Sequence, residues 1–377
     1  MTVLSPLPME VIVNSAQLNN AVMEMADATA IALDTESNSL HHYPEQLCLI
    51  QIATRNKVYV IDTIILKNIE PLRKILADNA VMKIIHGADY DIRSIDRHCG
   101  FHIHNLYDTY IAARFTGMTE VGLAALLRDL LGVNIEKIKR LQTADWGRRP
   151  LSVEATDYAA SDVRHLHRLQ EMLDKKLDAL GRKTWVAEEF SRLEEIRYTP
   201  PDLKNAYLAV KGNDILDGGG LAVLCRIFQF REEEAVRQHR PPFFIMPDNV
   251  LVSLAASPKA DLSGIPGLGR GLPRFKQGLQ QALQAGLAAP PIPRPAFIFM
   301  EPMNSAQLHR LSRLKAWRAS IASHLALDPS IIWPTPSLQR LAREPDTFDV
   351  EVKSSNVRRW QCEQFAFSLN EYLKTKT

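Results

Sequence analysis

The second half of the chain contains an internal repeat, which restricts its fold more than any other feature of the sequence. Residues 224–258 align without gaps on residues 311–345, at an offset of 87 residues, with eleven identical positions. The identical pairs are Leu224/Leu311, Arg226/Arg313, Arg231/Arg318, Ala235/Ala322, Pro242/Pro329, Ile245/Ile332, Pro247/Pro334, Leu251/Leu338, Leu254/Leu341, Ala255/Ala342 and Pro258/Pro345. Two copies of one small helical module are the simplest explanation.

Proline-rich segments separate these modules from each other and from the first half of the chain. One lies at 199–202, and the other spans 288–296, where four of nine residues are proline. Such runs cannot continue a helix and act as stiff connectors. We therefore expect three domains, at 1–198, 203–288 and 297–377.

The first of these domains mixes strands and helices. Short apolar, β-branched runs predict strands at 29–36, 47–53, 58–61 and 81–85, with a turn at Arg55-Asn56 between the second and the third. Helical periodicity follows at 71–77, 90–98, 123–131 and 153–180. This alternation predicts an α/β domain.

Two carboxylates end the first predicted strand. Asp34 and Glu36 are two residues apart, and because side chains alternate along a strand they project from the same face. Carboxylates this close raise each other's pKa unless a cation lies between them. The pair is either a polar strand end or half of a metal site.

A third carboxylate follows the strand at 81–85, where HGADYDI (86–92) opens a helix. Both Asp89 and Asp91 stand in its first turn. Acidic residues there are ordinary helix caps, which suits Asp89. We favour Asp91, further into the helix, as the side chain that points back at the sheet.

The predicted helix 153–180, with Ser152 as its N-cap, carries a fourth carboxylate. Its apolar stripe runs from Ala155 to Leu180 and includes Asp162 and Tyr158, which lie one turn apart. A carboxylate on a buried stripe needs a cationic partner, either an Arg or Lys side chain or a metal ion. Four separated oxygen ligands together describe a site for Mg²⁺ or Mn²⁺, and paired ions can hydrolyse phosphodiesters.

Charge is distributed unevenly along the chain. Residues 1–200 carry a net charge of −4 and residues 201–377 a net charge of +6. The candidates for contact with substrate phosphates are Lys139, Arg140, Arg148 and Arg149 before the helix at 153–180, and Arg226, Arg231, Arg270, Arg274 and Lys276 in the first module. The segment 265–269 (IPGLG) resembles the glycine hairpin of helix-hairpin-helix elements, which can bind phosphate through backbone N–H groups.

Three motifs resemble those of the DEDD superfamily of 3′→5′ exonucleases, in the subtype with Tyr in its third motif. They are DTESNSLHHYPEQLCLIQIA (34–53), HGADYDI (86–92) and YAASDVRHL (158–166). The helical modules resemble the HRDC domain, and the order of the domains resembles the ribonuclease D family over nearly the whole chain.

The resemblance implies a ribonuclease H-like α/β exonuclease domain with a mixed sheet, followed by two all-α HRDC-like domains. It implies that Asp34, Glu36, Asp91 and Asp162 bind two divalent cations, Mg²⁺ or Mn²⁺, and that Tyr158 orients the attacking water. The implied activity is release of 5′-mononucleotides from RNA 3′ ends, including tRNA precursors and other structured RNAs.

The sequence departs from the family pattern at two places. Ser37 stands where an aromatic residue is frequent, and Leu327 and Asp328 of the second module replace Arg240 and Pro241 of the first. Two alternatives remain open: a DNA 3′→5′ exonuclease, and an inactive nucleic-acid-binding scaffold.

The sequence also bears on where the protein works. Four widely spaced cysteines without a CxxC pair indicate neither a disulfide framework nor a structural zinc site. No apolar run is long enough for a membrane span, and the N-terminus lacks the pattern of a signal peptide. We expect a cytoplasmic protein without an obligate protein partner.

Overall fold

The computed structural model of the chain describes residues 7–136, 138–262, 265, 268, 272–294 and 301–374. In these residues the four cysteines are unpaired, as expected. None of the helices in the described ranges is long and apolar enough to cross a membrane.

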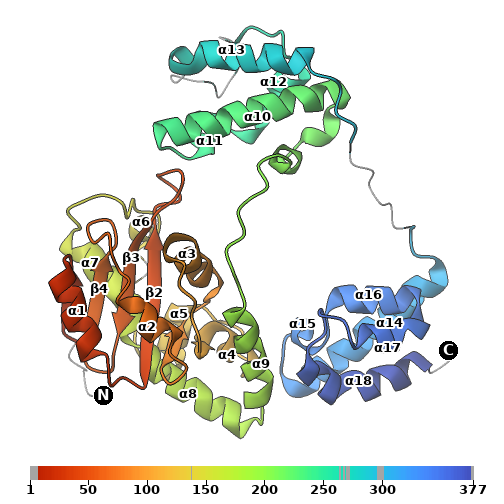
Figure 1. Cartoon of the computed structure of the whole chain (residues 1–377). Helices are drawn as coiled ribbons and strands as arrows, with labels where there is room; N and C mark the ends of the chain where they lie inside the picture. Colours follow the sequence, from red (N-terminus) through yellow and green to blue (C-terminus); the bar gives the residue numbers. More distant parts are fainter. Residues whose placement is uncertain are drawn as a thin grey trace.

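A mixed six-stranded sheet, in the order β1-β4-β3-β2-β5-β6, forms the centre of the first domain (Figure 1). Its strands are β1 (Met9–Ile12), β2 (Ala30–Ser37), β3 (Leu47–Ala53), β4 (Val58–Asp62), β5 (Met82–Ile85) and β6 (Leu106–Asp108). The middle strand β2 pairs antiparallel with β3 and parallel with β5. The four predicted strands are confirmed to within a residue or two, whereas the short edge strands β1 and β6 were missed.

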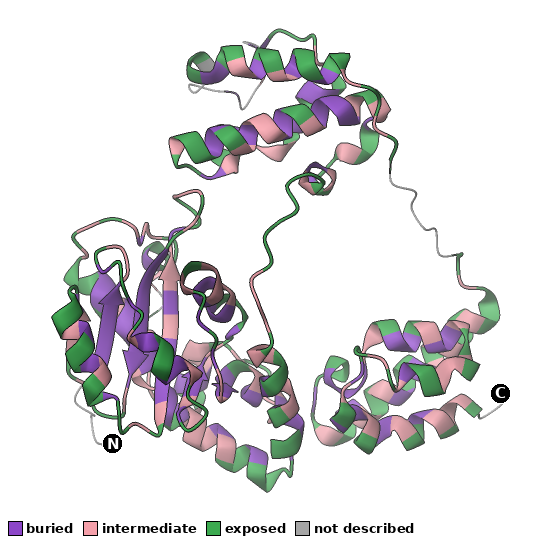
Figure 2. Ribbon diagram, in the orientation of Figure 1, coloured by how far each residue is buried: buried purple, intermediate pink, exposed green. Residues whose placement is uncertain are grey.

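Helices cover both faces of this sheet, whose strands are largely buried (Figure 2). One face packs with α1 (Ser15–Glu24), α2 (Leu72–Ala77) and α3 (Asp89–Cys99) around one apolar core. The other face belongs to a second core. This core includes α4 (Thr109–Phe115), α5 (Leu123–Leu126), α6 (Lys139–Gln142), α7 (Val153–Arg164), α8 (Leu166–Ala179) and α9 (Lys183–Glu194).

The predicted helix at 153–180 was wrong in one respect, since it is two helices. α7 ends at Arg164 and α8 begins at Leu166, with His165 between them. α7 lies against β2, β3 and β4, whereas α8 packs chiefly on α4, so the chain must change direction. The end of the predicted stripe was also wrong, because Leu180 is exposed. The helix expected at 123–131 is α5 followed by a π-helical turn, Leu127–Leu131.

The internal repeat is confirmed as a structural repeat at the same offset of 87 residues. In the first module α10 (Gly218–Gln238), α11 (Pro242–Ile245), α12 (Asp248–Ala256) and α13 (Leu272–Ala288) follow two short 3₁₀ turns, Ala206–Ala209 and Asn213–Ile215. In the second, α14 (Ser305–Leu325), α15 (Pro329–Ile332) and α16 (Thr335–Arg343) have the same lengths as α10, α11 and α12. A 3₁₀ turn (Pro345–Thr347), α17 (Phe348–Glu351) and α18 (Arg359–Lys374) complete it. In both modules the residue that follows the long helix has a left-handed backbone conformation with positive φ: His239 in the first and Ala326 in the second.

The two modules attach to the first domain differently. The second module shares the core on the α4, α8 and α9 side of the sheet, and Trp360 stacks on Trp185 with ring centroids 4.9 Å apart. Glu188 of α9 also accepts the backbone N–H groups of Arg359 and Trp360 at the start of α18. The first module has its own core, against which Tyr43 of the first domain packs.

Because Trp360 is 2% exposed and joins two domains, Trp360→Ala should destabilise the attachment of the second module. We expect a loss of about 3–5 kcal/mol, typical of a large aromatic side chain truncated in a core, measured as the free energy of the first urea-induced transition. Phe367 of the same module is 82% exposed, so Phe367→Ala is the matched control and should change stability by less than about 0.5 kcal/mol. Equal effects of the two variants would show that the shared core does not hold the module.

Candidate active site

Asp34 and Glu36 lie at the carboxyl end of the central strand β2 and come together with Asp162 of α7. One carboxylate oxygen from each of the three side chains can be chosen so that all lie within 4.8 Å of one another. A β-bulge between Glu36 and Ser37 ends the regular pairing of β2 with β3 at this point. Bulges are frequent beside active sites because they re-aim side chains.

Asp91, in the first turn of α3, lies beside this group, and its charge contributes to the raised pKa values of Asp34 and Glu36. It is not one of the three residues whose oxygens lie within 4.8 Å of one another. Its position is held from two sides. Thr35, between the two carboxylates of β2, donates a hydrogen bond of 2.5 Å to Asp91 Oδ1. The turn before α3 is held by Asp108, whose carboxylate accepts the backbone N–H groups of Gly87 at 3.0 Å and Ala88 at 2.9 Å. Asp108 is 2% exposed, so this anchor is built into the interior.

The alternative carboxylate, Asp89, points elsewhere. It forms a bidentate ion pair with Arg93 one turn along α3, at 2.8 and 3.2 Å, and its side chain is 58% exposed. Asp91, by contrast, is 6% exposed. The two aspartates thus differ in burial and in partners, and the choice of Asp91 as a metal ligand stays a prediction.

Tyr158 lies one turn before Asp162 on α7, at the edge of the carboxylates. The helix begins where expected, because Ser152 Oγ accepts the N–H of Ala155 at 3.1 Å. The Tyr158 ring stacks against buried Trp146, with centroids 6.2 Å apart and an angle of 28° between the rings. Gln142 lies near the Tyr158 hydroxyl and acts to lower its pKa, whereas the stacking on Trp146 holds the ring.

Burial raises the pKa of all four carboxyl groups, and repulsion between them adds to the shift for Asp34 and Glu36. Burial, with the charges of Asp91, Asp162 and Glu36 added, raises the pKa of Asp34 well above its usual range. Burial first, then Asp162 and Asp91, raises the pKa of Glu36 to about 8.

The pKa values of the other two carboxyls are also raised, chiefly by burial, although the hydrogen bond from Thr35 acts in the opposite direction on Asp91. Without a cation this group would be protonated in part near neutral pH.

The cluster has the composition of a divalent-cation site. No ion pair joins Asp34, Glu36, Asp91 or Asp162 to an Arg, Lys or His side chain in the described ranges. Several carboxylate oxygens facing one another form the donor set that hard divalent cations prefer. The residues present thus fit a bound cation, which would restore the charged form of the carboxylates.

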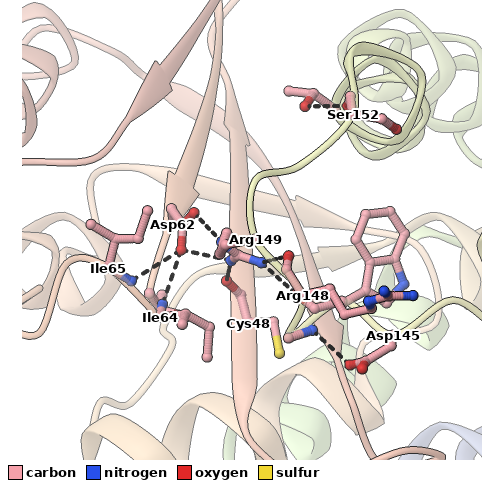
Figure 3. A network of polar contacts seen from close by, with 12 residues as sticks. Cys48, Asp62, Ile64, Ile65, Asp145, Arg148, Arg149 and Ser152 are labelled. Carbon is pink, nitrogen blue, oxygen red and sulfur yellow. Dashed lines mark hydrogen bonds and ion pairs between the residues drawn. The ribbon is translucent and has the colours of Figure 1, made fainter.

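The basic residues near this site divide into exposed and buried ones. Lys139, Arg140 and Arg148 are exposed, although Arg140 pairs with Glu154. Arg149 was predicted to contact substrate phosphates, and this prediction was wrong. Its guanidinium instead forms a bidentate ion pair of 2.5 and 2.6 Å with buried Asp62 (Figure 3).

The other N–H groups of Arg149 donate to the backbone carbonyls of Trp146, Arg148 and Cys48. The guanidinium therefore ties the segment before α7 to β3 and β4, and breaking its pair with Asp62 would leave a buried charge without a partner.

The basic residues of the first module divide in the same way. Arg226, Arg274 and Lys276 are exposed. The side chain of Arg231 is 8% exposed and forms ion pairs with Glu232 at 3.1 Å and with Asp248 at 2.7 Å. The prediction that Arg231 contacts substrate phosphates was therefore wrong. Arg270 and residues 266, 267 and 269 of the expected glycine hairpin lie outside the described residues.

Three residues near the site were not found from the sequence. Thr35 lies between Asp34 and Glu36, two carboxylates already predicted as site residues, so its position in the sequence could have pointed to it. Asp108 is the last residue of β6, a strand of three residues that is too short to be recognised in the sequence. Tyr90 precedes Asp91 in the second motif and is 46% exposed, and its hydroxyl lies 2.5 Å from that of Ser37.

Comparisons with known protein families agree with this geometry. Residues 9–178 match the family described as 3′-5′ exonuclease, and residues 220–278 match the HRDC domain. The chain is 31% identical to ribonuclease D of Gluconacetobacter diazotrophicus over 89% of its own length and 86% of that protein. It is 31% identical to ribonuclease D of Granulibacter bethesdensis over 84% and 81% of the two chains.

Solved structures confirm the expected fold class. The structure is similar to the crystal structure of Escherichia coli RNase D, with a TM-score of 0.74 and 21% identity over 98% of this chain and 99% of that one. A protein from Bifidobacterium adolescentis has a TM-score of 0.81, 21% identity, and coverage of 98% and 100%.

The geometry of α3 predicts different effects for its two aspartates. Asp91→Ala should abolish the rise in melting temperature that a divalent cation such as Mn²⁺ gives, because it removes a buried oxygen ligand. Asp89→Ala is the matched control and should keep that rise, since it breaks only an exposed ion pair that contributes little to stability. Differential scanning fluorimetry with and without Mn²⁺ measures both, and a normal metal response in Asp91→Ala would contradict this arrangement.

Proposed function

The chain belongs to the ribonuclease D family and is a metal-dependent 3′→5′ exoribonuclease, and we propose that its active site is the carboxylate cluster at the end of β2. In this proposal Asp34, Glu36, Asp91 and Asp162 hold two divalent cations, and Tyr158 assists the attack of water on the terminal phosphodiester. The observation that carries it is the convergence of these carboxylates without a cationic side chain as partner.

We propose Mg²⁺ or Mn²⁺ as the cations, since both prefer oxygen ligands. When bound, they supply the charge that stabilises a phosphodiester under attack and lower the pKa of the attacking water. The carboxylates would come from one strand and two helices of a rigid core, which suits a site that must hold its ligands accurately.

Tyr158 would act by orientation rather than by removing a proton. Burial, with a further contribution from the charge of Asp162, raises the pKa of its hydroxyl to about 12. The hydroxyl therefore stays protonated at neutral pH, and it can position a water molecule through hydrogen bonds. Trp146, on which the ring stacks, holds it in place for this task.

The substrates we propose are RNAs with free 3′ ends, including tRNA precursors and other structured RNAs. Exposed cations of the segment before α7 (Lys139, Arg140 and Arg148) and of the first module (Arg226, Arg274 and Lys276) would contact phosphates. A DNA exonuclease is the alternative that shares the same carboxylate arrangement. A cytoplasmic location stays a prediction.

The decisive experiment is a time course with 5′-labelled single-stranded RNA and DNA of one sequence, with Mg²⁺, Mn²⁺ or EDTA. We expect a descending ladder on RNA that EDTA abolishes, and release of 5′-mononucleotides. Faster degradation of DNA would favour the alternative substrate. Endonucleolytic cuts, or activity that EDTA leaves intact, would contradict the proposal.

Tyr158→Phe tests the role of the hydroxyl separately from that of the ring. We expect turnover to fall by about 10²-fold or more, the usual contribution of a positioned proton-handling group, while the melting temperature and RNA affinity change little. The ring that packs on Trp146 is retained, so a loss of stability with normal turnover would show that Tyr158 is a structural residue.

A further inference from the structure

The corner between α10 and α11 of the first module exposes two aromatic rings beside an arginine. Phe243 and Phe244 are 49% and 52% exposed, and their ring centroids lie 4.6 Å apart. The guanidinium of Arg240, which is exposed, lies 5.0 Å from the ring centroid of Phe244. We call these three residues the aromatic–basic corner.

Large apolar side chains exposed together beside a cation are unusual on a protein surface that has no binding role. The two phenylalanines also stand in a four-residue helix that begins with proline, Pro242. A short helix pre-set by proline holds the rings with little loss of freedom on binding.

In the second module, the equivalent corner between α14 and α15 is covered by the first domain. At the offset of 87 residues, Arg240, Phe243 and Phe244 correspond to Leu327, Ser330 and Ile331. Leu327 and Ile331 are 7% and 6% exposed and belong to the core shared with the first domain.

Polar contacts close the second module's corner onto α4 and α9. Arg182 donates to the carbonyl of Leu325 at 2.6 Å, and Arg114 donates to Ser330 Oγ at 3.3 Å. A corner that docks on protein therefore carries aliphatic and small side chains. The corner of the first module has a cation and two rings in their place, a composition that suits stacked bases and phosphates better than an aliphatic protein surface.

The aromatic–basic corner lies next to the loop 38–46 that leads directly out of the catalytic strand (Figure 1). His42 of this loop stacks on His239, with ring centroids 5.3 Å apart. Tyr43 donates a hydrogen bond of 2.7 Å to Glu232. Tyr43 follows Glu36 by seven positions in the sequence, so the chain between them can span at most about 25 Å.

The acidic groups around the corner are largely engaged in other contacts. Glu232 accepts hydrogen bonds from Tyr43 and Arg231, and Asp248 accepts from Arg231. Glu234 is buried and pairs with Arg237. Glu233 is exposed, and among the described residues it forms no ion pair. The cation at the corner thus stays available to a phosphate group.

We propose that the aromatic–basic corner binds single-stranded RNA upstream of the 3′ end, with bases stacked on Phe243 and Phe244 and a phosphate on Arg240. This inference rests on the proposed function in one respect, that RNA is the substrate. The corner would hold the strand whose 3′ end lies in the carboxylate cluster, so it adds affinity for RNA long enough to reach both places.

The first test is equilibrium binding to fluorescent single-stranded RNA in EDTA, where no hydrolysis occurs. Phe243→Ala/Phe244→Ala should weaken binding of an oligonucleotide of about 20 residues by about tenfold or more, the scale of base–aromatic stacking. Phe367→Ala is the matched control, an equally large exposed ring on the second module, and should bind as the unchanged protein does.

The cation is tested through the salt dependence of the same measurement. Arg240→Gln should flatten the slope of log affinity against log salt concentration by about one, the effect of one lost phosphate contact. Lys353→Gln, at an exposed cation of the second module, should leave the slope unchanged. Melting temperatures of all four variants verify that they are folded.

Stacking itself is tested with RNA that lacks single bases. One abasic position, moved step by step from the 3′ end, should weaken binding at a short run of positions. In the double phenylalanine variant the same positions should have no effect, because the partner rings are gone. Hydrolysis of very short RNA, confined to the carboxylates, should be equal in both proteins.

Four outcomes separate the ideas. Unchanged RNA affinity and salt slope in the corner variants would overturn the proposal. Unchanged RNA affinity with a changed oligomeric state in light scattering would show instead that the corner docks protein. RNA hydrolysis without any corner effect would leave the proposed function standing and refute the corner. Corner-dependent RNA binding without hydrolysis would support the corner and refute the proposed active site.

Discussion

The arrangement of the first domain depends on holding four like charges together in its interior. Asp34, Glu36, Asp91 and Asp162 come from one strand and two helices. Burial raises the pKa of each, and repulsion from the neighbouring carboxylates raises those of Asp34 and Glu36 further. An isolated group of this kind costs folding free energy, because each charge is taken out of water near others of the same sign. Such a cluster persists only when the surrounding packing forces it and a cation offsets its charge.

The surrounding packing supplies that force through buried polar anchors. Thr35 fixes Asp91 from the strand, Asp108 fixes the turn before α3, and Arg149 ties the segment before α7 to Asp62. Each anchor satisfies backbone or carboxylate groups that would otherwise be buried without partners. The three segments that carry carboxylates are therefore positioned by contacts that do not involve a metal.

The two helical modules show one backbone used for two purposes. Their first three helices have equal lengths at a constant offset, and Arg231 and Arg318 make corresponding contacts in both. Arg231 donates to the carbonyl of Met246 and to Asp248, and Arg318 to the carbonyl of Trp333 and to Thr335. The corner side chains differ, and with them the surface that each module presents there. The aliphatic copy completes the core of the first domain, whereas the aromatic copy stays exposed beside the loop after β2.

The sequence by itself determined the features that local geometry controls. Strand alternation placed Asp34 and Glu36 on one side of β2, a serine before a helical pattern located the start of α7, and the repeat offset anticipated matching helices. Each of these depends on residues a few positions apart, because backbone periodicity and capping act locally.

Only the tertiary structure decided the rest. It buried Asp91 against Thr35 and paired exposed Asp89 with Arg93. It also divided the helix at His165, and it paired Arg149 with Asp62 and Arg231 with Asp248 instead of leaving both arginines for a substrate. It also merged the second module into the core of the first domain. The partner of a charge and the surface under a helix are set by which distant segments pack together, and local sequence patterns carry no record of that.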